Sequence, residues 1–243
     1  METITYHIEA QVGEAHWWFQ ARRRILHDVL SHLRLSARPR IYDLGCGTGH
    51  NLIMLQELGE ATGIDMSADA LAYCRELGCR STLQGNLYAL PVSDDSADVV
   101  VASDILEHLD DDQRGAAEIH RVLKGDGEGV AVITVPAFQW LWGTQDDVSH
   151  HKRRYTKAEV KALLEGAGLT IEKLTYFNCF LFPPIWLGRL AIKFSKAKIE
   201  SENTLTSPKL NGLLEGIFAS ERFWLRRSGF PIGVSVLAIA RKR

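Results

Sequence analysis

The feature that most constrains the fold of this chain is the segment 41–50, which reads IYDLGCGTGH. Apolar residues surround Asp43, glycines follow at every second position (Gly45, Gly47 and Gly49), and a helical pattern begins after the last glycine. Glycine permits positive φ and lets a ligand approach the backbone closely. The N-terminus of a helix offers free N–H groups. The segment therefore predicts a strand, a tight turn and a helix arranged around a ligand.

The spacing of the glycines distinguishes this turn from the dinucleotide-binding fingerprint. In that fingerprint, G-x-G-x-x-G, the third glycine comes one residue later, at the position where this chain has His50. Asp43 would repel a phosphate and attract an ammonium group. The turn therefore fits a cationic, nucleoside-bearing ligand better than NAD.

Strand and helix patterns alternate along the first part of the chain. Five strands are expected at 41–44, 61–64, 81–83, 98–102 and 129–135, with helices at 51–58, 67–77 and 110–124 between them. Two further strands are expected at 169–177 and 234–240. This alternation predicts an α/β fold with a doubly wound, mostly parallel, seven-stranded sheet. The ligand of such a sheet binds at the carboxyl ends of the strands.

The length of the chain fits a single α/β domain covering residues 1–243. Residues 1–36 are expected to form an N-terminal helical lid and 37–135 the cofactor-binding core. Residues 136–243 are expected to form the substrate side. Within that side, a helical insertion at about 178–230 would cap the sheet before the last strand.

The composition and net charge of the chain indicate which binding partners and which cellular compartment to expect. A net charge of −2 gives no broad basic surface, so nucleic-acid binding is not expected. The four cysteines lack metal-type spacing and fit free thiols in a reducing cytosol. No secretory signal and no apolar run of roughly 18 to 20 residues is present, so a cytoplasmic location is expected. No metal is expected either, because the histidine pair at 150–151 has no evident third ligand.

Several motifs together resemble the class I S-adenosylmethionine (SAM) dependent methyltransferases. The segment 43–49 resembles the first motif of that family, 84–91 the third and 103–109 the fourth. The sequences HWWFQARRR near the N-terminus and HKRRYT at 151–156 resemble a bacterial subgroup known as methyltransferase type 11. The resemblance covers nearly the whole chain. It implies the Rossmann-like methyltransferase fold, with SAM as the cofactor and S-adenosylhomocysteine as the product.

The resemblance also implies which residues meet the cofactor. Asp65 would accept hydrogen bonds from the ribose hydroxyls, and the other interpretation is a helix cap near Ser67. Asn86 stands where the family usually has an acid and would accept from the adenine amino group. The aromatic segment at 15–24 is either core packing or a lid whose arginine meets the cofactor carboxylate. The expected cofactor contacts are Asp43, Gly45, Cys46, Gly47, Thr48, Gly49, Asp65, Met66, Asn86, Leu87, Ser103, Trp18 and Arg23.

The reaction implied is methyl transfer to an oxygen or nitrogen nucleophile of a small-molecule or lipid- or glycan-like acceptor. A general base is needed only if that nucleophile is protonated at neutral pH. The catalytic candidates are His108, His150, His151 and Tyr155; a structural role is the other interpretation of His108. Three alternatives stay open: SAM cyclisation that releases methylthioadenosine, a non-catalytic SAM-binding module and, as the weakest, a dehydrogenase.

The segment 180–198 combines aromatic and aliphatic residues with Arg189, Lys193, Lys196 and Lys198. It is too short to span a bilayer. Its composition fits an interfacial amphipathic helix that would give peripheral membrane contact. It fits equally well a homodimer surface or a roof over an apolar substrate.

Overall fold

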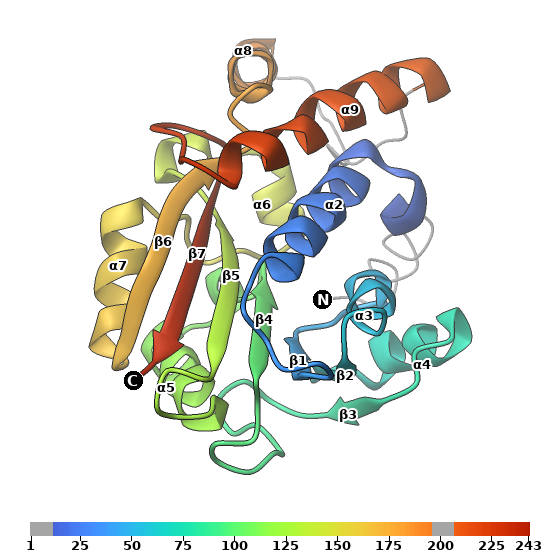
Figure 1. The fold of residues 1–243 in the computed structure, drawn as a ribbon. Helices are drawn as coiled ribbons and strands as arrows, with labels where there is room; N and C mark the ends of the chain where they lie inside the picture. The colour runs from blue at the N-terminus through green and yellow to red at the C-terminus, as the bar shows by residue number, and fades with distance from the viewer. Residues whose placement is uncertain (1–11, 196–206) are drawn as a thin grey trace.

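The computed structural model describes residues 12–195 and 207–243, which build one seven-stranded sheet with helices on both faces (Figure 1). The order of the strands is β3-β2-β1-β4-β5-β7-β6. Strands β1 to β5 run parallel to one another, and β7 is antiparallel to both β5 and β6. The strands are β1 (Arg40–Leu44), β2 (Glu60–Asp65), β3 (Thr82–Gln84), β4 (Val99–Ser103), β5 (Val130–Pro136), β6 (Leu169–Phe177) and β7 (Ser235–Lys242).

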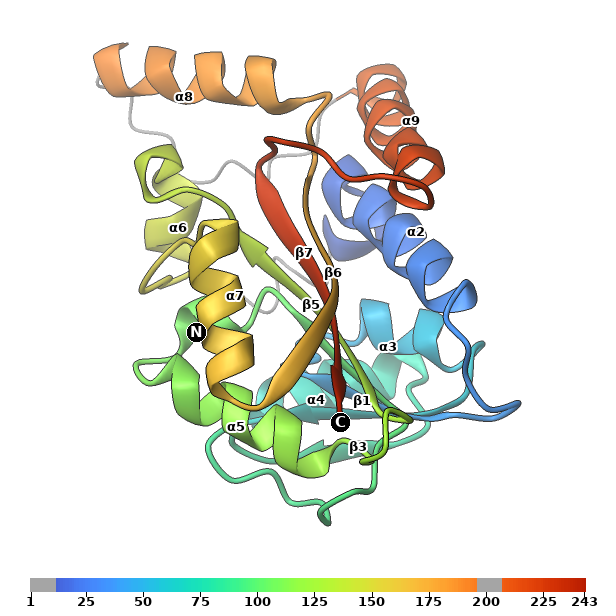
Figure 2. The same cartoon turned by 60° about the vertical axis from the view of Figure 1, so that its left-hand side comes forward.

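The helices cover the two faces of the sheet in groups that follow the chain (Figures 1 and 2). One face carries α2 (Trp17–Ser31), α3 (His50–Leu55) and α4 (Ala68–Leu77). The other face carries α5 (Asp112–Val122) and α7 (Lys157–Gly166). The short helices η1 (Leu106–His108), η2 (Gln139–Leu141) and α6 (Thr144–Val148) follow β4 and β5. The doubly wound, mostly parallel sheet expected from the sequence is confirmed.

Local sequence signals account for most of these boundaries. Ser67 caps α4 through its hydroxyl, and Gly78 ends that helix in the left-handed conformation. Thr156 and Glu159 form a capping box, whose residue pattern is readable in the sequence, at the start of α7. Every residue of β4 and β5 is buried, as expected for central parallel strands covered on both faces. The expected strand 169–177 coincides with β6.

Two long helices lie between β6 and β7, in the segment expected to form a cap. These are α8 (Phe182–Ser195) and α9 (Pro208–Leu225), and both lie beyond the end of the sheet at which β5 ends (Figure 2). α9 runs beside α2, and Asn211 links the two helices by accepting from the Trp17 N–H at 2.9 Å. In the part of the chain that the structure describes, no helix is long and apolar enough to cross a membrane. Lys196 and Lys198 lie outside the described residues.

Candidate active site

The turn between β1 and α3 has the geometry that its glycines predict. Gly45, Gly47 and Gly49 have φ values of 67°, 52° and 93°, in the left-handed region that L side chains rarely adopt. At Gly45 a Cβ atom would also lie 2.5 Å from the side chain of Ile105, which follows β4. The backbone of the turn therefore lies close to the carboxyl end of β4, and no larger residue fits there.

Asp43 lies beside this turn in β1 with an unusual lack of partners. The residue is 1% exposed, and its Oδ2 atom has no hydrogen-bond partner among the described residues. Burial raises the pKa of Asp43 to about 7, although the charge of Arg22 works against that rise. A buried carboxylate oxygen without a partner is costly. The unpartnered oxygen of Asp43 therefore fits a ligand that brings a positive charge or an N–H donor to the turn.

Asp65 ends β2, and its carboxylate organises the same turn. Its two oxygens accept from the backbone N–H of Gly47 and of Ser67, both at 2.9 Å. The capping hydroxyl of α4 belongs to Ser67, so the acid is not the N-cap residue. Each carboxylate oxygen has further lone pairs. Asp65 can therefore hold the turn in place and still accept from a ligand hydroxyl.

The remaining expected contacts lie at the ends of β2, β3 and β4. Asn86 is exposed, and its side-chain carbonyl already accepts from the Tyr88 N–H at 2.9 Å, which leaves one lone pair for a ligand. Leu87 is buried and Met66 is exposed. Ser103 is buried with its hydroxyl 3.1 Å from that of Thr134. These residues line the edge of the sheet at which a doubly wound fold binds its ligand.

The side chain of Cys46 points away from the turn's open side. Its sulfur lies 3.9 Å from that of Cys74, and Cys74 donates to the Gly47 carbonyl at 3.1 Å. Cys79 donates to the Gly49 carbonyl at 3.7 Å. All four cysteines are free. Three thiols thus pack behind the glycine turn, where Cys46 can offer a ligand only its backbone. Thr48 is also buried.

The arginine of α2 that reaches the strand ends is Arg22. It forms an ion pair with Asp104, which follows β4, and lies 4.4 Å above the ring of Trp18. Arg22 is buried because it shares a helix face with the core residues Ala21 and Ile25. That 3.6-residue periodicity is the signal by which the sequence could have singled out Arg22.

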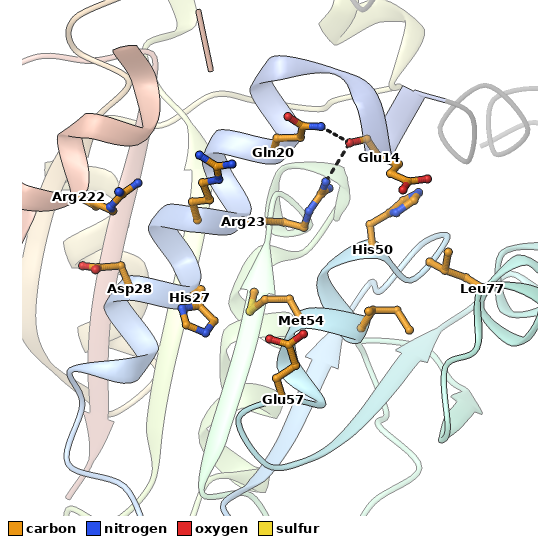
Figure 3. Close-up of a pocket in the computed structure, with 12 residues that line it drawn as sticks. Glu14, Gln20, Arg23, His27, Asp28, His50, Met54, Glu57, Leu77 and Arg222 are labelled. Atoms are coloured by element: carbon orange, nitrogen blue, oxygen red, sulfur yellow. Dashed lines mark hydrogen bonds between the residues drawn. The ribbon is translucent and has the colours of Figure 1, made fainter. Parts of the chain in front are cut away.

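Arg23, the arginine expected at the cofactor, lies on the other side of α2. It donates to the carbonyl of Gly13 at 2.6 Å and lines a cleft of about 670 Å³ between α2 and α3 (Figure 3). The cleft borders His50 and Met54 but includes none of the acids at the strand ends. The structure therefore places Arg23 beside the glycine turn and apart from the ends of β1 and β4.

A second group of side chains follows β4. Asp104 has a φ of 53°, pairs with Arg22, and accepts from the Thr134 hydroxyl at 3.2 Å. Glu107 is fully buried, and neither of its carboxylate oxygens has a hydrogen-bond partner among the described residues. Burial, reinforced by the charge of Asp104, raises the pKa of Glu107 well above its ordinary value. Burial and the nearby His151 lower the pKa of His108 to about 4, so its imidazole is neutral at pH 7.

The segment after β5 brings His151 to this group. The ring centroids of His108 and His151 lie 4.8 Å apart, and the backbone N–H of Lys152 donates to the Glu107 carbonyl at 2.8 Å. The Nδ1 atom of His151 lies 2.8 Å from a carboxylate oxygen of Asp146. This contact leaves Nε2 of His151 directed toward Glu107, 3.8 Å from Oε1.

Asp146 is the buried anchor of this arrangement, and sequence reasoning did not find it. Its carboxylate accepts from Arg154 Nε at 2.8 Å and from the Gly143 N–H at 2.7 Å, besides its contact with His151. Burial alone would raise the pKa of Asp146, but His151 and Arg154 lower it to about 2. Asp146 is therefore ionised at neutral pH and fixes the orientation of the His151 ring.

The other two catalytic candidates have different surroundings. The Tyr155 hydroxyl donates to Asp112 at 2.8 Å, and burial together with this bond raises the pKa of the phenol. Tyr155 is thus a neutral, buried group that links the end of β5 to α5. His150 is exposed and lies outside the group around Glu107.

Comparisons with known proteins agree with the fold and the glycine turn. The type 11 family model described as a methyltransferase domain matches residues 42–131. A probable S-adenosylmethionine-dependent methyltransferase from Mycolicibacterium smegmatis is 30% identical over 165 residues, which cover 66% of this chain and 62% of that protein. The chain spans 55–62% of the length of this protein and two relatives from Mycobacterium tuberculosis.

Two solved structures share the fold at low sequence identity. A putative methyltransferase from Haloferax volcanii, solved in complex with a methyltransferase activator, has a TM-score of 0.64 at 18% identity and covers 98% of this chain and 94% of its own. The cyclase SpnF has a TM-score of 0.60 at 22% identity, covering 90% of this chain and 80% of its own. Residues 42–131 are therefore a methyltransferase domain of the type 11 family, within a chain that has the class I methyltransferase fold.

Proposed function

We propose that this protein is a SAM-dependent methyltransferase that transfers a methyl group to an oxygen or nitrogen nucleophile. The observation that carries this proposal is the unpartnered, buried oxygen of Asp43 beside three left-handed glycines. SAM carries an ammonium group and two ribose hydroxyls, which match an unpartnered carboxylate and the neighbouring Asp65. The family match and the SAM-dependent relative support the same cofactor.

The residues around the turn would bind and orient the cofactor. The acid of β1 would face the amino group, Asp65 the ribose and Asn86 the adenine ring. Arg22, held by Asp104 and Trp18, closes the side next to β4. SAM supplies a methyl group that is already electrophilic because it is bonded to a sulfonium. The protein must then align the nucleophile with that methyl group and exclude water.

The acceptor would bind beside the polar group formed by Glu107, His108, Asp146 and His151. This group follows β4 and β5, so it lies at the same edge of the sheet as the cofactor residues. An acceptor hydroxyl must lose its proton during methyl transfer. Among the candidate histidines, His151 has the strongest support for a role beside the acceptor, because Asp146 fixes its ring.

Product analysis separates methyl transfer from its alternatives. The purified protein is incubated with SAM and pools of small hydroxyl- and amine-bearing metabolites, lipids and glycan precursors. The proposal predicts S-adenosylhomocysteine and a methylated acceptor. Methylthioadenosine would instead identify the cyclisation reaction. If the protein binds SAM but forms no product with any of the pools, the result would indicate a non-catalytic SAM-binding module.

A lipid-like acceptor would agree with the surface formed by α8 and α9, and we propose that this surface meets anionic lipid. Trp186 and Leu187 of α8 and Phe223 and Trp224 of α9 are all exposed. No residue of α8 is acidic, and Glu215 and Glu221, the acids of α9, are both buried. Among the described side chains of these helices, the charged ones that are exposed or half-buried, Arg189, Lys209 and Arg222, are therefore basic, which complements an anionic bilayer.

Vesicle co-sedimentation tests the lipid surface. The wild-type chain should pellet with vesicles that contain an anionic lipid, and Leu187→Glu should reduce the pelleted fraction at least severalfold. Leu83→Glu, which changes an exposed leucine of β3 at the opposite edge of the sheet, is the matched control. Absence of pelleting would remove the proposal, and a dimer seen by light scattering and lost in Leu187→Glu would assign the surface to a second copy of the chain.

A further inference from the structure

The group formed by Glu107, His108 and His151 has the composition of a metal site. One potential ligand atom from each residue can be chosen so that all lie within 4.8 Å of one another. We propose that these three residues bind one divalent first-row transition-metal ion next to the methyl acceptor. Sequence reasoning expected no metal, because the third ligand lies far along the chain from the histidine pair.

The strongest support is the state of Glu107. Its carboxylate is completely buried, and neither oxygen accepts a hydrogen bond from any described residue. The nearest nitrogen recorded for it, Nε2 of His151, is 3.8 Å from Oε1, which is too far for a hydrogen bond. A buried carboxylate without donors is stable only if a cation or a proton reaches it.

The surroundings of His151 provide the second, independent support. Histidines that bind metals usually donate their other ring N–H to a carboxylate, which fixes the tautomer. Nδ1 of His151 lies 2.8 Å from a carboxylate oxygen of Asp146, and Arg154 holds that carboxylate in place. This contact directs Nε2 of His151, the nitrogen nearer Glu107, to the position where it would bind a metal.

The donor set indicates which ions fit. Two imidazoles and one carboxylate are the ligands of many Zn²⁺ and Fe²⁺ sites, and they leave positions open for a substrate. Metal–ligand bonds of about 2.1 Å place ligand atoms roughly 3.0 to 3.5 Å apart. The carboxylate and Nε2 of His151 are already close to that separation. The His108 ligand atom lies within 4.8 Å of both, so it would have to move closer when the ion binds.

The charges around the group leave room for a cation. The half-buried carboxylate of Asp104 is paired with Arg22, and the buried carboxylate of Asp146 with Arg154. Lys152 and Arg153 pair with Asp110 and Asp112. Among the described residues, no Lys or Arg forms an ion pair with Glu107, whose nearest recorded basic group is His151. A divalent ion would neutralise the Glu107 carboxylate and keep one positive charge to hold an acceptor oxygen.

The site would explain how the acceptor loses its proton. A metal-bound hydroxyl has a lowered pKa, because the ion stabilises the oxyanion. The proton passes to solvent, the oxygen attacks the methyl carbon, and the bond from that carbon to sulfur breaks. This catalytic role rests on the proposed methyl transfer, but metal binding itself does not.

Cobalt titration of the full chain tests the site. Protein treated with a chelator and desalted is titrated with CoCl₂, and visible absorption reports binding to nitrogen and oxygen ligands. We expect one equivalent to bind. Glu107→Gln, His108→Ala and His151→Ala should each weaken binding by more than about tenfold, and Asp146→Asn by about tenfold. His150→Asn, which changes the adjacent exposed histidine, should bind cobalt like the wild type.

Two outcomes would overturn the proposal. The first is a chelator-treated protein that retains its thermal unfolding transition but binds no cobalt. The second is binding that His150→Asn weakens as much as His151→Ala, which would indicate surface histidines only. SAM titration of the same samples keeps this test separate from the proposed function, because cobalt binding does not require SAM.

Discussion

The two halves of the ligand site are built in different ways. On the cofactor side, the glycine turn, its buried acid and Asp65 all come from residues 43–65, and backbone conformation sets their geometry. On the acceptor side, Glu107 and His108 follow β4, whereas Asp146 and His151 follow β5. Buried charges order the segment after β5, and the Lys152 N–H bond to the Glu107 carbonyl and the contact between the His108 and His151 rings join it to the segment after β4. The comparison teaches that a local motif can specify cofactor binding, but the acceptor site depends on tertiary contacts.

The largest expected effect is at the acceptor side, with Asp146→Ala. This change leaves Arg154 buried without its partner, and breaking a buried pair costs about 3 to 5 kcal/mol of unfolding free energy. Urea denaturation measures the loss. Asp147→Ala, which changes the exposed neighbour, should cost less than about 1 kcal/mol. Equal effects of the two changes would show that buried charges do not hold this side together.

On the cofactor side, Gly45→Ala should also destabilise the fold, by about 3 kcal/mol. The left-handed conformation accounts for about 1 to 2 kcal/mol of this, and the clash with Ile105 for the remainder. Gly216→Ala in α9, where an added Cβ meets nothing within 4 Å, should stabilise by up to about 1 kcal/mol. If urea denaturation gives both variants the same stability, neither the left-handed conformation of Gly45 nor its contact with Ile105 requires glycine at this position.

Asp65→Ala should weaken SAM binding by roughly 2 kcal/mol, because the ribose hydroxyls lose a charged acceptor. The glycine turn also loses the acceptor of the Gly47 N–H. Calorimetric titration measures the change. Asp65→Asn, which keeps one oxygen acceptor, should show a smaller loss. Unchanged affinity in Asp65→Ala would mean that the ribose site is misassigned.

The smallest expected effect is a pH dependence of SAM binding that follows Asp43. Burial raises the pKa of Asp43 to about 7, so the carboxylate gains a proton as the pH falls below that value. The protonated form cannot attract the ammonium group of SAM. Affinity should therefore fall by up to about tenfold per pH unit below pH 7. Titrations in the Asp43→Asn variant should show no such slope; a slope of equal size would assign the pH dependence elsewhere.

The sequence predicted the sheet and the glycine turn because their signals are local. Apolar runs marked the strands, and capping residues such as Ser67 and Thr156 marked helix starts. These signals require only neighbouring residues, so they can be read without knowing the fold. The position of Asp43 beside a left-handed turn follows from the same short segment.

The parts that sequence reasoning missed depend on loop conformation and on contacts between distant segments. Asp146 contacts His151 and Arg154 within the same loop, but no helix or strand periodicity there indicates that its carboxylate will be buried. The isolation of Glu107 likewise depends on the loop after β5. Arg23 was chosen over Arg22 because two adjacent arginines look alike until the buried face of α2 is known.

The central claim is that the glycine turn and Asp43 bind SAM, and one calorimetric experiment tests it most directly. The purified chain, freed of any nucleoside carried through purification, is titrated with SAM, S-adenosylhomocysteine and NAD. The account predicts that both sulfur nucleosides bind with a stoichiometry of about one and that NAD does not bind, because Asp43 repels phosphate. Binding of NAD, or no binding of either sulfur nucleoside by the folded protein, would contradict it.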